Sequence, residues 1–168
     1  MNLSDLVFIV TALITVTAAV GVVGFKNIVH SALSLVLSFL GVAALYFQLQ
    51  AGFLGLVQIL VYAGAVSVLI IFAIMLVMDK DPDESNRSHA KQKYWGGLIA
   101  LLVTLGLGAA IGSTIWPQSS GSLPEDCVGA LATLLLGDYV VAFEVAALLL
   151  LVAVVGAIIL AKGAGEHD

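Results

Sequence analysis

The chain has 168 residues, of which 61% are hydrophobic and only 10% are charged, and its mean hydropathy is +1.16. A soluble domain has roughly a quarter of charged residues, because its surface must be hydrated. A chain with so little charge cannot cover a soluble surface, so most of its surroundings must be lipid. Six basic residues make no patch for a nucleic acid. The single cysteine, Cys127, excludes an internal disulfide.

Charged residues divide the chain into long neutral segments. One helical crossing of the hydrocarbon core needs about 20 apolar residues. The neutral segments provide five crossings, with a turn at 48–52 and polar loops at 79–93 and 117–137; within the last loop, 128–136 is apolar enough to lie against the membrane. We therefore predict an all-α integral membrane protein, a single membrane domain over 1–168, with five transmembrane helices at about 4–25, 28–48, 53–78, 94–116 and 138–161.

The basic residues predict the orientation of these helices. Five crossings place the two termini on opposite sides of the membrane, and all basic residues then fall on one side. Lys and Arg in short loops stay on the cytoplasmic side. We therefore expect the N-terminus outside and the C-terminus in the cytoplasm, with these residues on the cytoplasmic side: Lys26, Lys80, Arg87, Lys91, Lys93 and Lys162.

The third predicted helix has polar and small residues where a membrane crossing needs only apolar ones. At about 100° per residue, Gln58 and Tyr62 share one face, and Gly64 and Ser67 lie on the opposite face. Such residues are common where membrane helices pack, but they can equally line a water path, and both interpretations stay open. The segment 53–78 is longer than one crossing requires, which leaves room for tilt or a π-bulge.

Glu144 is the carboxylate that lies well inside a predicted helix. A charged side chain at the bilayer centre costs about 3 kcal/mol or more, so Glu144 should face protein or water. It can handle a proton or pair with a partner. Alternatively, it can reach the outer interface, since Asp138 is only six residues earlier. Both interpretations stay open.

The second predicted helix has small residues at helical spacing, which indicate a packing seam; they are Ser31, Ser34, Ser38 and Gly41. His30, near the cytoplasmic interface, is expected to be solvated. The sequence has no Gly-rich phosphate loop, no nucleophile elbow and no haem or iron–sulfur ligand set. We therefore expect no catalytic residue, no bound cofactor and no metal site in this chain.

Several stretches of the chain resemble one family. They are NIVHSAL (27–33), FLGLVQILVYAGA (53–65), VYAGAVSVLIIFAIMLV (61–77) and LLLGDYVVAFEVAALLLL (134–151). In order and spacing they are similar to subunit J of bacterial NADH-quinone oxidoreductase, the counterpart of chain 6 of mitochondrial complex I. The resemblance covers essentially the whole chain.

The resemblance implies a non-catalytic membrane-arm subunit of a proton-pumping NADH-quinone oxidoreductase, in the inner (plasma) membrane of a bacterium. Its partners would be neighbouring small subunits, the quinone-module subunit and the antiporter-like subunits, besides the lipid bilayer, and no nucleic acid. FMN, iron–sulfur clusters and quinone would lie in other subunits of the complex.

In this family the third helix has a π-bulge near the residue that matches Tyr62, and its conversion to a regular helix is thought to open or close a water path. The resemblance implies that Gln58 and Tyr62 form the polar wall of that path, beside a pliable backbone around Gly64 and Ser67. Some members have Glu at the position of Gln58, and a neutral amide cannot carry a proton charge. We predict that the backbone from Tyr62 to Ser67 departs from a regular α-helix in at least one state.

Other classes of protein remain as alternatives. Membrane-bound hydrogenases and multisubunit cation/proton antiporters contain related segments, and a purely structural helix bundle is a further possibility. A single five-helix chain with an intact closing segment favours the oxidoreductase. The sequence has no inverted repeat and no paired intramembrane charges, which opposes a self-sufficient carrier. The electron donor, the quinone and the coupling ion are left open.

Overall fold

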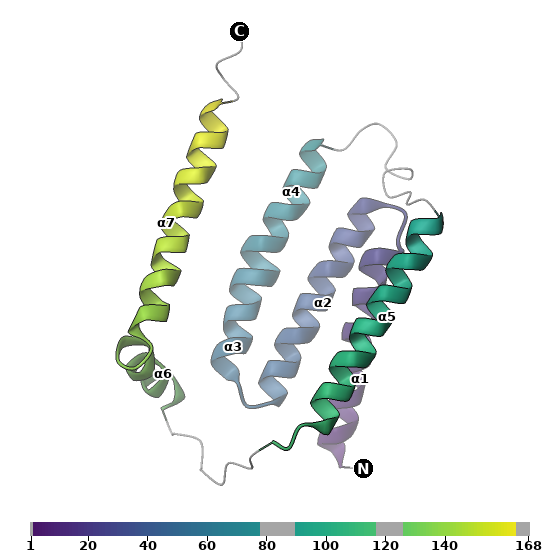
Figure 1. Ribbon diagram of the computed structural model, residues 1–168, viewed down its shortest axis with the longest axis horizontal. Helices are drawn as coiled ribbons and strands as arrows, with labels where there is room; N and C mark the ends of the chain where they lie inside the picture. The colour runs from purple at the N-terminus through teal and green to yellow at the C-terminus, as the bar shows by residue number, and fades with distance from the viewer. Residues whose placement is uncertain (1, 78–89, 117–125, 164–168) are drawn as a thin grey trace. The chain divides into compact units, whose positions relative to one another are not determined.

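The computed structural model describes residues 2–77, 90–116 and 126–163, and these residues form helices, with short described connections at 25–27, 49–51 and 137–139 (Figure 1). Two compact units are present, Met1–Pro117 and Gln118–Asp168, and each is described by itself. The single membrane domain over 1–168 stays a prediction. The helices are α1 (Leu3–Gly24), α2 (Ile28–Gln48), α3 (Gly52–Val57), η1 (Gln58–Val66), α4 (Ser67–Val77), α5 (Ala90–Ser113), α6 (Cys127–Leu136) and α7 (Val140–Gly163).

Small residues let α1 and α2 approach each other closely. A Cβ atom added to Gly41 would overlap the side chain of Thr15. The hydroxyl of Ser34 donates a hydrogen bond across the interface to the carbonyl of Ala18, at 2.7 Å. Close backbone approach and interhelical hydrogen bonds hold helices together in lipid, where the hydrophobic effect provides little attraction between them. The predicted packing seam on the second helix is thus confirmed at Ser34 and Gly41.

Polar groups also define both ends of α2. At its start, the Asn27 side chain accepts a hydrogen bond from the backbone N–H of Val29 at 2.9 Å, so it acts as the N-cap. At its end, Gln48 Nε2 donates to Thr11 Oγ1 of α1 at 2.8 Å. His30 is exposed near the first of these ends, as expected, with its ring 6.2 Å from that of Phe25.

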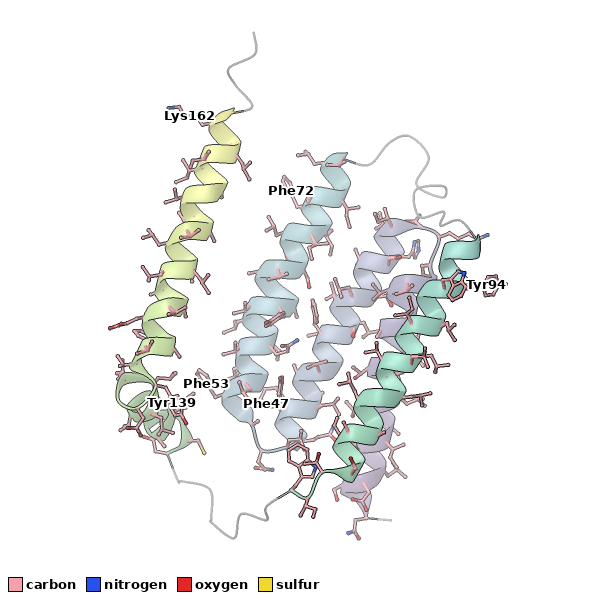
Figure 2. The ribbon with its side chains drawn as sticks, in the orientation of Figure 1. Phe47, Phe53, Phe72, Tyr94, Tyr139 and Lys162 are labelled. Carbon is pink, nitrogen blue, oxygen red and sulfur yellow. The ribbon has the colours of Figure 1, made fainter. Side chains whose placement is uncertain are left out.

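The third helix consists of α3, η1 and α4 without a break, and it packs against α2 (Figure 1). The turn before it lies within the predicted 48–52, where Gln50 has a φ of 60°. This left-handed conformation costs about 1–2 kcal/mol for a residue other than glycine. The glycine of this turn, Gly52, does not have the left-handed conformation and is the first residue of α3. The ring of Phe47, labelled in Figure 2, covers Gly55, since an added Cβ there would lie 2.9 Å from the ring.

The later helices differ from the predicted ranges. The fourth crossing is α5, which starts at Ala90 and ends at Ser113 instead of covering 94–116. Its early start includes Lys and Gln, which are good helix formers, and Pro117 in the sequence disfavours helical backbone just before it. The fifth crossing begins at Val140 instead of 138, since the stretch from Gly137 to Tyr139 forms a turn.

The expected loop 117–137 contains a helix, α6, which is a correction of the prediction. Asp126 caps its start, because the carboxylate accepts a hydrogen bond from the backbone N–H of Gly129 at 2.8 Å. The apolar stretch that was expected to lie against the membrane therefore folds as ten residues of helix. That length is too short for one crossing.

Five helices within the described residues are long and apolar enough to cross a membrane: Leu3–Gly24, Ile28–Gln48, Gly52–Val77, Tyr94–Ser113 and Val140–Gly163. The predicted all-α membrane fold with five crossings is confirmed. The buried apolar residues among those described are only Ala18, Ala32 and Ala43, whereas large apolar side chains are mostly exposed. Such a surface requires lipid or partner subunits around it.

The orientation of the termini stays a prediction. Lys26 lies in the connection between α1 and α2, and Lys162 lies in the last turn of α7 (Figure 2). Lys91 and Lys93 belong to the first turns of α5, whereas Lys80 and Arg87 lie outside the described residues.

Candidate functional site in the third helix

The middle of the third helix is π-helical over Gln58–Val66. In this conformation each N–H bonds the carbonyl five residues earlier, whereas in an α-helix it bonds the carbonyl four residues earlier. The stretch from Tyr62, for which the sequence predicts an irregular backbone, is the C-terminal part of this segment, and Ser67 is the first residue of α4. The sequence did not indicate that the π-helix begins as early as Gln58.

Gly64 lies where the π-helical backbone approaches itself. A Cβ atom added to Gly64 would lie 3.2 Å from the carbonyl oxygen of Ile59, which is five residues earlier. This is tighter than an ordinary van der Waals contact, so a side chain would push the two turns apart. Glycine also disfavours regular α-helix by about 1 kcal/mol relative to alanine. A residue without a side chain therefore suits this turn for both reasons.

Ser67 closes the π-helical segment at its C-terminal end. Its hydroxyl donates a hydrogen bond of 2.7 Å to the carbonyl of Tyr62, and its backbone N–H is directed at the carbonyls of Tyr62 and Gly64. The side chain is only 1% exposed. Carbonyl groups at a change of helix type need donors when water is excluded. Ser67 supplies two such donors at this junction.

Gln58 and Tyr62 lie on the part of the third helix that packs against α2. Gln58 is 8% exposed, and its amide makes no hydrogen bond to the described residues. Tyr62 is 46% exposed, and the edge of its ring meets Phe39 of α2, with 5.6 Å between the ring centroids and 65° between the planes. Among the described residues, Gln48 Oε1 is the buried side-chain polar atom without a hydrogen-bond partner, so the amide atoms of Gln58 are not fully enclosed and can bind a water or a group from another chain.

The structure brings the four predicted residues of the third helix into one π-helical segment and its junction. They do not divide into a polar and a small face as the sequence predicted, since Gln58 and Ser67 are both buried and Tyr62 is half exposed. The reason is the π-helix, because the predicted faces assume 100° per residue throughout.

Glu144 lies in the second turn of α7, in the other compact unit, and it is exposed. Its carboxylate has no hydrogen bond or ion pair with the described residues. A pairing partner on another subunit and a position at the outer interface both agree with this exposure.

The sequence did not identify Phe39 as a neighbour of the site. Nothing in the pattern of the second helix distinguishes this residue from the other large apolar residues there, and the ring pair depends on how α2 and the third helix meet. Within the described residues, no group of three His, Cys, Asp or Glu side chains could hold a metal ion.

The fold and the site define a class of protein: a multi-pass α-helical membrane subunit whose distinctive feature is a π-helical crossing that contains the buried residue Gln58. Residues 18–160 match the model of the family described as NADH-ubiquinone/plastoquinone oxidoreductase chain 6. The chain therefore belongs to this family.

Individual relatives agree with the family. The chain is 40% identical to NAD(P)H-quinone oxidoreductase chain 6 of Synechocystis, over 96% of this chain and 84% of that protein. It is 37% identical to F(420)H(2) dehydrogenase subunit J of Methanosarcina mazei, over 98% of this chain and 94% of that protein. It is also 37% identical to the chloroplastic NAD(P)H-quinone oxidoreductase subunit 6 of Adiantum capillus-veneris, over 96% and 88%. The prediction that the chain is a membrane subunit of a quinone oxidoreductase complex is confirmed.

Proposed function

We propose that the third helix of this subunit lines and gates a water path for protons in the membrane arm of the oxidoreductase, between the quinone module and the antiporter-like subunits. The observation that carries the proposal is the π-helical segment with Gln58 buried and without a hydrogen-bond partner among the described residues. The amide of Gln58 can donate to one water and accept from another, so it can hold a short water chain in place.

The neutral amide of Gln58 orients water and carries no net proton charge. Tyr62, a half-exposed residue, contributes a hydroxyl to the same segment, and its ring packs against that of Phe39. Conversion of the π-helix to an α-helix would change the hydrogen-bond partner of each carbonyl by one residue. The residues N-terminal to the converted segment, including α3, would therefore rotate relative to α4. Gln58 would then turn relative to α2, and the waters bound to it would be displaced.

The remaining surfaces support a place inside a larger assembly. The exposed large apolar side chains of α5 and α7 fit lipid and neighbouring membrane subunits, and the Glu144 carboxylate, which has no partner among the described residues, fits a neighbouring subunit. FMN, iron–sulfur clusters and quinone belong to other subunits in this proposal, because the sequence lacks a ligand set for them. The location is the inner (plasma) membrane of a bacterium.

The electron donor is a separate question. The printed names of the relatives include both NAD(P)H and F(420)H(2) as donors. Because the proposed path lies in the membrane subunit, its operation does not depend on which donor feeds the complex. Purification of the complex with identification of its subunits would name the donor module.

Gly64→Leu tests the gating role. A leucine would crowd the Ile59 carbonyl, whereas Gly97→Leu in α5 is the control, since nothing lies within 4 Å of a Cβ there. We expect Gly64→Leu to lower the number of protons pumped per electron pair severalfold in the assembled complex, with a smaller effect on quinone reduction. Equal proton-to-electron ratios in wild type, Gly64→Leu and Gly97→Leu would contradict the proposal.

A further inference from the structure

The hydroxyl of Ser67 makes a hydrogen bond that differs from those of the other helical hydroxyls. In α1, Thr11 and Thr15 each donate to a carbonyl four residues earlier, both at 2.8 Å. In α5 and α6, Thr104 and Thr133 do the same, at 2.8 and 2.9 Å. Ser67 instead donates to the carbonyl of Tyr62, five residues earlier, at 2.7 Å. This spacing is that of the π-helix and not of the α-helix.

The geometry of the backbone explains the difference. A Ser or Thr hydroxyl on a helix bonds the carbonyl that its own turn presents, which in an α-helix is the one three or four residues earlier. The backbone N–H of Ser67 is directed at Tyr62 as well as at Gly64. The hydroxyl and the N–H of one residue therefore converge on the Tyr62 carbonyl. In an α-helix the Ser67 hydroxyl would be placed to bond Ala63, four residues earlier.

The burial of Ser67 makes its hydrogen bond to the Tyr62 carbonyl important for the backbone. Ser67 is the most buried polar residue of the described chain, at 1% exposure. Because the side chain is almost completely excluded from solvent, loss of the hydroxyl leaves the Tyr62 carbonyl with one donor fewer. A buried carbonyl that loses a donor is destabilised more than an exposed one.

We infer that Ser67 is the positioning residue that holds the third helix in its π-helical state, through the hydrogen bond from its hydroxyl to the Tyr62 carbonyl. By stabilising the five-residue spacing, Ser67 keeps Gln58 buried near α2 and the Tyr62 ring against Phe39. Ser67 itself contacts no transported species in this role. The inference concerns what sets the backbone, and it holds whether or not the segment gates a water path.

The test uses the purified intact complex with Ser67→Ala, and with Ser38→Ala as the matched control. Ser38 is also a buried serine, at 9% exposure, and it lies in the regular helix α2. Cryo-electron microscopy of each variant gives the fraction of particles whose third helix is π-helical. The hydroxyl could bond the Ala63 carbonyl in the α-helical state, but such a bond is slightly unfavourable for an α-helix. Ser67→Ala should therefore shift the ratio of π-helical to α-helical particles toward the α-helix by the difference between the two bonds, about two- to threefold. Ser38→Ala should leave this ratio unchanged.

A second, more conservative variant keeps the test informative if Ser67→Ala assembles poorly. Ser67→Cys keeps a weak donor of similar size, so its π-helical fraction should lie between those of wild type and Ser67→Ala. An unchanged π-helical fraction in both Ser67 variants would overturn the inference. Proton-to-electron ratios measured on the same samples separate the two proposals. A shifted helix with normal pumping rejects the gating role alone, whereas impaired pumping with an unshifted helix rejects the role of Ser67 alone.

Discussion

The third helix and α7 are equally apolar crossings by mean hydropathy, but they use their polar residues differently. In the third helix, Gln58 and Ser67 are buried, and the hydroxyl of Ser67 is bonded within the helix. In α7, the Glu144 carboxylate is exposed and has no partner among the described residues. Apolar composition thus determines that both helices cross the membrane. It does not determine whether a polar group is satisfied within the chain or by a neighbouring subunit.

Topology gives the sharpest test, because its outcome is all or none. Reporter proteins fused after Asp79 and after Gly121 follow the third helix and precede α7, respectively. We expect the first to report the cytoplasm and the second the exterior, because the basic residues lie in the loops assigned to the cytoplasm. The measurement is the activity of paired reporters that work on only one side of the membrane. The reverse pattern would disprove the predicted orientation.

Replacement of Gly41 by leucine should cause the largest effect on stability. Its side chain would overlap Thr15 at the contact of α1 and α2, and overpacking costs about 1–3 kcal/mol. We expect the amount of assembled complex in the membrane to fall severalfold, as measured by quantitative native gels. The control is Gly108→Leu in α5, where nothing lies within 4 Å of a Cβ. Equal losses for the two variants would show that packing within the chain is not the cause.

Replacement of Glu144 by alanine tests whether the polar group of α7 is paired with a neighbouring subunit. If α7 depends on a partner subunit, the loss of a paired intramembrane carboxylate should reduce assembly or pumping a few-fold, corresponding to about 1 kcal/mol. Val141→Ala, on the same exposed helix, should have little effect. Similar, negligible changes for both variants in proton pumping by membrane vesicles would place Glu144 at the outer interface instead.

The smallest expected effect concerns the bond between Gln48 and Thr11. Gln48→Leu removes a 2.8 Å hydrogen bond between α2 and α1, and such bonds in membrane bundles contribute about 0.6 kcal/mol on average. The thermal midpoint of dissociation of the complex should decrease by about a degree. Thr17→Val is the control, because that hydroxyl bonds only carbonyls of its own helix among the described residues. An equal decrease of the thermal midpoint for Thr17→Val would show that the hydrogen bond between Gln48 and Thr11 does not contribute to the stability of the complex.

The sequence by itself determined the five crossings and the close contact on the second helix. The second crossing was predicted as 28–48 and is observed as Ile28–Gln48, because hydropathy and capping residues such as Asn27 act locally. The small residues Ser34 and Gly41 could be predicted for the same reason, since their spacing along one helix sets which face can approach another. α6 was missed, because its apolar stretch is too short for a crossing and the capping residue Asp126 alone does not distinguish a short helix from an apolar loop.

Only the tertiary structure decided which polar groups of the third helix are buried and how the backbone runs between them. Gln58, Tyr62, Gly64 and Ser67 were predicted as candidate residues, but their faces were assigned for a regular helix. The π-helix begins at Gln58 and rearranges those faces. This segment packs against α2, has the Phe39 ring beside Tyr62, and ends at the buried hydroxyl of Ser67. Contacts between segments far apart in the chain set this arrangement, and no periodicity within one segment records them.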